Sequence, residues 1–149
     1  MARKAKPLPA GTIYRLVDAN VNRCREGLRV IEDTARFIIE DPVGYRKLRS
    51  VRHTFDAAVR SAYPRLLNNR NSIADSGRRI KEGARPSVHD VVAANCKRVQ
   101  EALRVLEEYG KVIAPHASAV FKQVRYALYT IEKRLIPRIR KWEKHYDHH

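Results

Sequence analysis

Arginine, asparagine and glutamate side chains recur at matched positions in two stretches of this sequence, 75 residues apart. A guanidinium group grips a phosphate through paired hydrogen bonds, so a repeated arginine is a candidate contact for an anionic ligand. Asparagine is a poor helix former, and an amide at the edge of an apolar stripe needs a hydrogen-bond partner. The repeated residues are Asn20/Asn95, Arg23/Arg98, Glu26/Glu101, Arg29/Arg104 and Glu32/Glu107.

The same spacing also allows an interpretation without a ligand. Residues three apart on a helix can form ion pairs, as Arg29 and Glu32 would, each worth about 0.2–0.5 kcal/mol. Pairing between the two stretches is equally consistent for Arg29, Glu32 and their counterparts. Asn20 and Asn95 could bond another helix or touch a ligand. The sequence alone therefore allows both ligand binding and pairing within the protein for these residues.

Positions at which the two stretches differ are also informative, because a symmetric scaffold must break its symmetry to bind an asymmetric ligand. Lys97 and Arg98 beside Asn95 form a basic cluster on one helical turn, which favours phosphate capture, although a solvated face is the alternative. The differing pairs are Asp18/Ala93, Asn22/Lys97 and His53/Tyr126.

Apolar residues at steps of three and four predict helices and no sheet. Asp41-Pro42 and Ser87 through Asp90 have the residue types of helix starts, and Pro137 is expected to kink or break the last helix. The expected helices cover about residues 12–38, 42–63, 87–113 and 119–145.

An internal repeat organises these helices. Leu16 to Ile38 aligns with Val91 to Ile113 without gaps, and ten of the 23 aligned pairs are identical. We therefore expect an all-α fold of four long helices, built as two repeated hairpins in an up-down bundle with a pseudo-twofold axis. The expected parts are a flexible basic tail (1–12) and a single helical-bundle domain (13–145), the latter comprising repeat 1 (about 13–64), a loop (65–86) and repeat 2 (about 87–145).

The polar stretch 65–86 is longer than most loops of a compact domain, which indicates either a functional loop or a plain connection. It carries Arg70, Asp75 and Gly77 among further basic residues, as a lid over phosphates would. The sequence contains neither of the phosphate-binding motifs GxxxxGK[ST] and GxGxxG. It also contains neither CxxC nor HExxH, the spacings typical of redox and metal sites.

Composition adds a strong charge bias and little else. The 31 lysines and arginines against 16 acidic residues give a net charge of +15, which predicts an anionic partner: nucleic acid, a phosphorylated small molecule, or no more than a solubilising surface. Cys24 and Cys96 fall in apolar helical patterns and indicate reduced core thiols. The first eleven residues do not resemble a secretory leader, and no membrane span is expected, so a cytoplasmic protein is predicted.

Two segments are similar to a known family. DANVNRCREGLRVIEDTARF (Asp18 to Phe37) and AANCKRVQEALRVLEEYGK (Ala93 to Lys111) resemble the small all-helical hydroxymethylpyrimidine-phosphate kinases, which occur alone or fused N-terminal to thiamine-phosphate synthase. Arg52-His53 and the loop from Arg70 to Gly77 match the same family, over about residues 14–111. Asn71 departs from the pattern, because the family usually carries an acidic residue there.

The resemblance implies an ATP- and Mg²⁺-dependent phosphotransferase of thiamine biosynthesis. It would move the γ-phosphoryl group of ATP onto 4-amino-5-hydroxymethyl-2-methylpyrimidine phosphate to form the diphosphate. The acceptor is already ionised, so the task is to align two anions and neutralise their charge. The implied roles are catalytic for Arg23, Arg52, Arg98 and Glu101, binding for Asn20, Asn22, His53, Arg70, Asn95 and Lys97, and metal-holding for Glu26 and Asp75.

Two further interpretations compete with a kinase. A basic bundle could bind nucleic acid without catalysis, and the cations of the expected last helix favour that; such a protein would show a steep salt dependence. An inactive scaffold relative of the kinase is the other. Helical hairpins with wide apolar stripes often pack again, so a homodimer is a further expectation.

Overall fold

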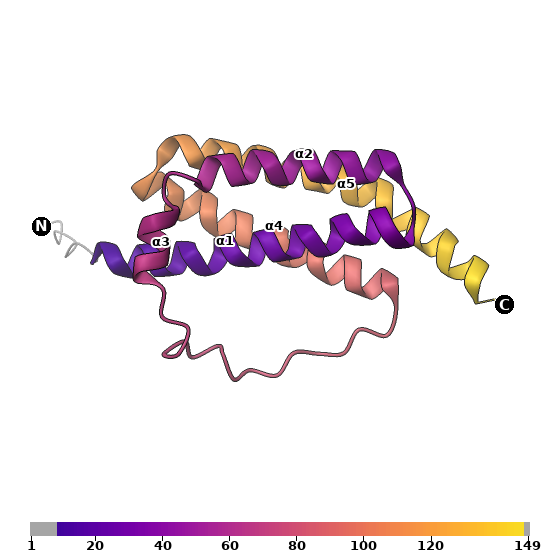
Figure 1. Cartoon of the computed structure of the whole chain (residues 1–149), viewed down its shortest axis with the longest axis horizontal. Coiled ribbons are helices and arrows are strands. Elements are labelled where there is room, and N and C mark those ends of the chain that lie inside the picture. Colours follow the sequence, from indigo (N-terminus) through magenta and orange to yellow (C-terminus); the bar gives the residue numbers. More distant parts are fainter. Residues whose placement is uncertain (1–8, 148–149) are drawn as a thin grey trace, which may run out of the picture.

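The computed structural model describes residues 9–147, and these residues form helices and no strand. The four longer α-helices run along the long axis of the molecule (Figure 1), and α3 is a short helix at one end of the bundle. The elements are α1 (Ala10–Asp33), a π-helical segment η1 (Thr34–Ile38), α2 (Pro42–Val59), α3 (Tyr63–Asn69), α4 (Val88–Ile113) and α5 (Pro115–Tyr146).

The all-helical prediction is confirmed, but the described residues hold five α-helices rather than four. The additional helix, α3, follows a turn after α2 and extends into the stretch expected to be loop. Helix α5 continues through Pro137, which was expected to kink or break it. The buried side chains of Leu135 and Ile139 on either side hold this part of α5 against the bundle. Their burial offsets the hydrogen bond that proline removes.

Helix starts follow local chemistry. The Ser87 hydroxyl accepts a hydrogen bond from the Asp90 amide at 3.1 Å, as the capping-box pattern predicts. Pro42 and Pro115 each occupy the first turn of a helix, where the missing amide proton costs nothing. At the end of α1 the α-helix continues as the π-helical segment η1. The Thr34 hydroxyl at its start donates a hydrogen bond to the Val30 carbonyl at 2.8 Å.

One apolar core lies between the four long helices. Its central side chains include Val21, Leu28, Leu103 and Leu128, all of them fully buried. Cys24 and Cys96 are buried free thiols within this core. Burial, together with the nearby Asp56 carboxylate, raises the pKa of Cys24, and burial and Glu132 raise the pKa of Cys96 to about 12. None of the helices in the described part is long and apolar enough to cross a membrane.

A buried carboxylate joins the α1–α2 corner to α5. Asp41 is 3% exposed, its Oδ1 accepts from Arg134 at 3.1 Å, and Arg138 lies 3.8 Å from its Oδ2. Gly44 leaves room for this carboxylate, because a Cβ there would lie 2.5 Å from Oδ2. Burial opposes ionisation, but the hydrogen bonds from Arg134 and from the Gly44 amide, with the charges of Arg134 and Arg138, outweigh it and lower the pKa of Asp41 below 3.8.

Asp41 should therefore make stability depend on pH in the acid range. A carboxyl whose pKa is lower in the folded protein stabilises it above about pH 4, and this contribution is lost as the pH falls through the folded pKa. We expect Asp41→Asn to unfold at lower urea concentration than wild type at pH 7. The difference between the two should shrink as the pH falls below about 4. Urea titrations at pH 7, 4 and 3 measure it, and a difference that is independent of pH would contradict the assignment.

Candidate functional site

The repeated glutamates are buried and paired across helices. Glu32 on α1 is 1% exposed and accepts two hydrogen bonds from Arg52 on α2, at 2.5 and 3.1 Å. Glu107 on α4 is 3% exposed and accepts two from Arg125 on α5, with the same donor atom types and the same distances. These pairs fasten α1 to α2 and α4 to α5. The glutamates raise the pKa of both arginines through their hydrogen bonds, so both guanidinium groups stay charged.

A polar cavity of about 450 Å³ lies between α1 and α2, directly beside the Glu32–Arg52 pair. One ion pair crosses it, because Arg25 on α1 lies 3.2 Å from Asp56 on α2; Arg29 lies 3.7 Å from Glu32 on its own helix. Three arginines line this cavity and give it the charge that an anion would need. The residues that line it are Asn22, Arg25, Glu26, Arg29, Arg52 and Asp56.

A second polar cavity, of about 440 Å³, lies where α1 meets α4 under the loop before α4. Arg98 points toward the loop and lies 3.6 Å from Glu82, an exposed pair. Glu26 lines both cavities, so the two adjoin at this residue. We call these two adjoining cavities together the Glu26 cleft. The second cavity is lined by Glu26, Gly27, Val30, Glu82, Gly83, Arg85, Ala94, Asn95 and Arg98.

Close helix contact shapes the second cavity. Gly27 meets α4 so closely that a Cβ at this position would lie 2.5 Å from a methyl group of Val99 and 3.4 Å from the Asn95 carbonyl. Any side chain at position 27 would push α1 and α4 apart. The absence of a side chain there brings the Asn95 and Arg98 side chains of α4 near Glu26 of α1.

Arg70, expected to bind a ligand, holds a buried carboxylate in this structure. Its guanidinium group donates two hydrogen bonds of 2.8 Å to Asp18, which is 4% exposed. The hydrogen bond to Asp18 is the largest of the causes that raise the pKa of Arg70. The contact fixes the end of α3 on α1. It has no counterpart in the second repeat, because Ala93 aligns with Asp18.

The other predicted residues are spread more widely. The Asn20 amide donates to the Leu16 carbonyl and accepts from Arg23, and the Asn95 amide donates to the Val91 carbonyl. Both asparagines thus bond their own helix. Three of the predicted residues are exposed and line neither cavity of the Glu26 cleft: His53, Lys97 and Glu101. None of the three forms a side-chain hydrogen bond or ion pair with another residue of the segment 9–147.

The two predicted metal ligands are not brought together in one cavity. Glu26 lines the cleft, whereas the Asp75 carboxylate accepts the Gly77 amide in a turn of the exposed loop. Within residues 9–147 no group of three or more histidine, cysteine or acidic side chains could hold a metal ion. A magnesium ion here would therefore depend on phosphate oxygens and water for most of its ligands.

Sequence reasoning missed three charged residues of the Glu26 cleft, Arg25, Asp56 and Glu82, whereas Arg85 is one of the basic loop residues expected to cover phosphates. Arg25 and Asp56 are not repeated, because Gln100 and Tyr129 occupy the matching positions. The rule that a ligand site should break the symmetry of the repeat would have found them, had every differing pair been considered. Glu82 and Arg85 belong to the loop, whose path over α1 and α4 has no sequence signal.

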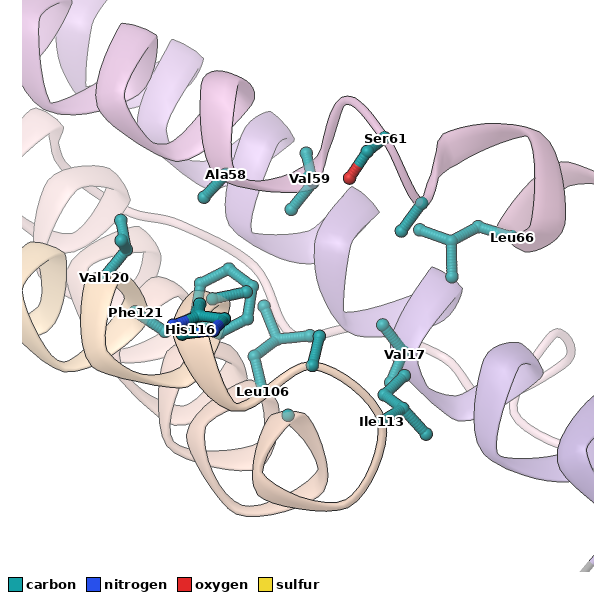
Figure 2. Close-up of a pocket in the computed structure, with 14 residues that line it drawn as sticks. Val17, Ala58, Val59, Ser61, Leu66, Leu106, Ile113, His116, Val120 and Phe121 are labelled. Carbon is teal, nitrogen blue, oxygen red and sulfur yellow. The ribbon is translucent and has the colours of Figure 1, made fainter.

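An apolar cavity of about 380 Å³ lies at the end of the bundle that carries α3 (Figure 2). Val59 and Leu66 line it from the α2–α3 side, and Leu106 and Phe121 from the α4–α5 side. Of the predicted site residues it contains none. Its chemistry does not suit a phosphate, and we place no anion there.

Comparison with known proteins identifies the family. The model of the ThiD2 family matches residues 15–134. The chain is 41% identical over 134 residues to the thiamine-phosphate synthase of Synechococcus sp. (strain CC9605), a match covering 85% of this chain and 37% of that protein. Thiamine-phosphate synthases of Parasynechococcus marenigrum (strain WH8102; 42% identity, 80% and 34% covered) and Rhodopirellula baltica (37%, 83% and 34%) are similar to it as well. No solved structure matches the chain.

These relatives correct the functional expectation. They are named as thiamine-phosphate synthases, a different enzyme from a hydroxymethylpyrimidine-phosphate kinase, so the kinase prediction is wrong. The alternatives of a nucleic-acid-binding bundle or an inactive kinase scaffold find no support in those names either. What the comparisons support is a family whose domain also occurs in thiamine-phosphate synthases. The chain spans only about a third of the length of these relatives. This chain belongs to the ThiD2 family.

Proposed function

We propose that this chain is a helical ligand-binding domain of thiamine biosynthesis, and that the Glu26 cleft holds a small phosphorylated pyrimidine. The observation that carries the proposal is the gathering of arginines from α1, α4 and the loop around two adjoining cavities. The names of the relatives support a phosphorylated ligand, because thiamine phosphate is itself a phosphate ester. Synthase activity of the full-length relatives is not assigned to this chain.

The arginines of the cleft differ in how freely they could bind a phosphate. Arg52 is committed to a buried carboxylate, and leaving that carboxylate unpaired would cost several kcal/mol. Arg25 and Arg98 pair at 3.2 and 3.6 Å with carboxylates that are partly or largely exposed, and Arg29, itself exposed, lies 3.7 Å from the buried Glu32 that Arg52 already holds. Exposed pairs contribute only about 0–1 kcal/mol, so a doubly charged phosphate can compete with Asp56 and Glu82 for Arg25 and Arg98, and Glu32 does not depend on Arg29. We assign phosphate contact to these three and a positioning role to Arg52.

The remaining residues of the cleft suit recognition of the pyrimidine. Asn22 lines the first cavity, and the Asn95 side chain lines the second beside Ala94 and Gly27. An amide offers both a donor and an acceptor, as a ring with amino and ring-nitrogen groups requires. Glu26, which lies between the cavities, can accept from a ring amino group. ATP and Mg²⁺ stay proposals as ligands, with Glu26 the predicted metal ligand that reaches the cleft.

We further propose that the two hairpins are copies related by an approximate twofold axis. The support is that the aligned pairs Glu32–Arg52 and Glu107–Arg125 join the same atom types at the same distances. The single-domain boundaries, the homodimer and the cytoplasmic location stay predictions.

Calorimetric titration with 4-amino-5-hydroxymethyl-2-methylpyrimidine phosphate tests the binding proposal. We expect saturable binding, with much weaker binding of the alcohol that lacks the phosphate. Arg98→Ala should weaken binding of the phosphate ester about 10- to 100-fold, because a charged hydrogen bond contributes roughly 1.5–3 kcal/mol. Arg46→Ala is the matched control, since Arg46 is exposed on α2 and lines neither cavity.

Two outcomes would remove the proposal. Equal affinity for the ester and the alcohol would show that no phosphate is recognised. Equal weakening by Arg98→Ala and Arg46→Ala would show that only the overall positive charge attracts the ligand. Circular dichroism of both variants should match wild type, because both arginines are exposed and neither contributes to the core.

A further inference from the structure

The C-terminal part of α5 continues as one helix past the point at which α2 ends and the chain turns into the short α3. Helix α2 ends at Val59, which aligns with Glu132, whereas α5 continues to Tyr146 (Figure 1). We call residues 133–146 the α5 extension. The match to the ThiD2 family ends at residue 134, so nearly all of the extension lies outside the family-matched region. The single tryptophan of the chain, Trp142, lies in this segment.

Contacts on two sides fix the extension on the bundle. Arg134 and Arg138 face the buried Asp41 carboxylate at the start of α2, at 3.1 and 3.8 Å. On the other side, the Glu143 carboxylate accepts the backbone amide of His89 at 2.8 Å. Ile139 between them is fully buried. The remaining face of the helix is therefore presented in a fixed direction.

That face forms one wall of a cavity of about 540 Å³, lined by cations and aromatic rings and by no carboxylate. Arg138 lies beside Asp41, but no carboxylate of the described chain lies within ion-pair distance of Lys141 or Lys144. Trp142 packs on Tyr146 with ring centroids 4.7 Å apart. The lining residues are Ile39, Arg138, Lys141, Trp142, Lys144 and His145.

Helix electrostatics explain only part of this arrangement. A cation in the last turn of a helix favours the negative end of the helix dipole, and Lys144 lies in that turn. Arg138 and Lys141 lie before it. Arg138 and Lys141 line the same cavity as the Trp142 indole. An anionic ligand with a flat ring is bound by such a combination, because the cations bind its charged group and the indole stacks on its ring.

We propose that this cavity is a second binding site, for a small phosphorylated aromatic compound. Lys141 and Lys144 contact the phosphate, Arg138 adds a third positive charge, and the ring of the ligand packs on Trp142. No residue is shared with the Glu26 cleft, so the site does not rest on the function proposed above.

Trp142 provides a direct readout, because fluorescence excited at the red edge of the spectrum comes from this residue alone. Phenyl phosphate is the probe, and phenol and inorganic phosphate are its two halves. We expect saturable quenching by phenyl phosphate, with at least about tenfold higher affinity than either half, and a loss of affinity as the salt concentration rises. Calorimetry of the same three compounds measures binding independently of the fluorescence.

Paired variants locate the site. Lys141→Ala/Lys144→Ala should weaken phenyl phosphate binding about five- to tenfold. Lys122→Ala/Lys133→Ala removes the same charge from exposed positions of α5 that do not line the cavity, and should leave the affinity within twofold of wild type. Arg98→Ala should leave the quenching unchanged, which separates this site from the Glu26 cleft.

Three results would overturn the proposal. Phenol binding as tightly as phenyl phosphate would indicate an apolar site, and equal weakening by the two lysine pairs would indicate only nonspecific charge. The absence of saturable binding by both fluorescence and calorimetry, in protein with wild-type circular dichroism, would show that the cavity takes no such ligand.

Discussion

Replacing Arg52 with methionine is expected to lower the free energy of unfolding by about 3–5 kcal/mol. Glu32 is almost fully buried, and Arg52 supplies both of its close hydrogen bonds. Arg29, at 3.7 Å and largely exposed, cannot replace them. Removal of one partner of a buried pair leaves a charge without compensation, which is far costlier than losing the pair as a whole. Urea unfolding followed by circular dichroism measures the change.

The double variant Glu32→Met/Arg52→Met tests the reason for this loss. Methionine fills a similar volume without charge, so the double variant should recover most of the stability lost in Arg52→Met. Arg49→Met is the control, because Arg49 is an exposed arginine of the same helix and should lose less than about 0.5 kcal/mol. If Glu32→Met/Arg52→Met is no more stable than Arg52→Met, the loss in Arg52→Met does not come from an unpaired buried charge on Glu32.

Replacing Arg70 with methionine is expected to cost nearly as much, about 3 kcal/mol, for a related reason. Asp18 is buried, and its two hydrogen bonds of 2.8 Å both come from Arg70. The variant leaves this carboxylate unpaired and releases the end of α3 from α1. Thermal or urea unfolding gives the loss of stability. Faster proteolysis of the segment after Asn69 should accompany it, because the contact holds the start of that segment.

The second repeat supplies the rescue for this variant. Alanine occupies the position that matches Asp18, so the helix accepts a small apolar residue there. Asp18→Ala/Arg70→Met should therefore be more stable than Arg70→Met alone. If the double variant is the less stable of the two, the carboxylate stabilises α1 in some way other than through Arg70.

Most of the fold could be predicted from the sequence because each long helix carries its own periodic apolar stripe and a recognisable start. Ser87 and Pro42 gave the starts of two helices directly. The short helix α3 was missed, since seven residues with a proline in the first turn carry too little periodicity to distinguish a helix from a loop. Pro137 was misjudged because local propensity favours a break, whereas burial on both sides of it depends on tertiary packing.

The site was less predictable, because spacing along one helix does not identify partners on another. The repeat singled out Glu32 and Glu107, and the family resemblance singled out Arg52, but neither indicated that Arg52 and Arg125 hold these two glutamates. Arg70 had the residue type of a phosphate ligand, and its commitment to Asp18, 52 positions earlier, is a property of the fold alone. Arg25 and Asp56 escaped notice because they are not repeated.

The two buried cysteines have a practical consequence. A thiol reacts with maleimides and disulfides only as the thiolate, and Cys24 and Cys96 are shielded from solvent with raised pKa values. Alkylation at neutral pH therefore requires the helices around them to open. The rate of labelling then reports how often the native molecule unfolds, so the destabilised variants above can be ranked by mass spectrometry in dilute buffer without denaturant.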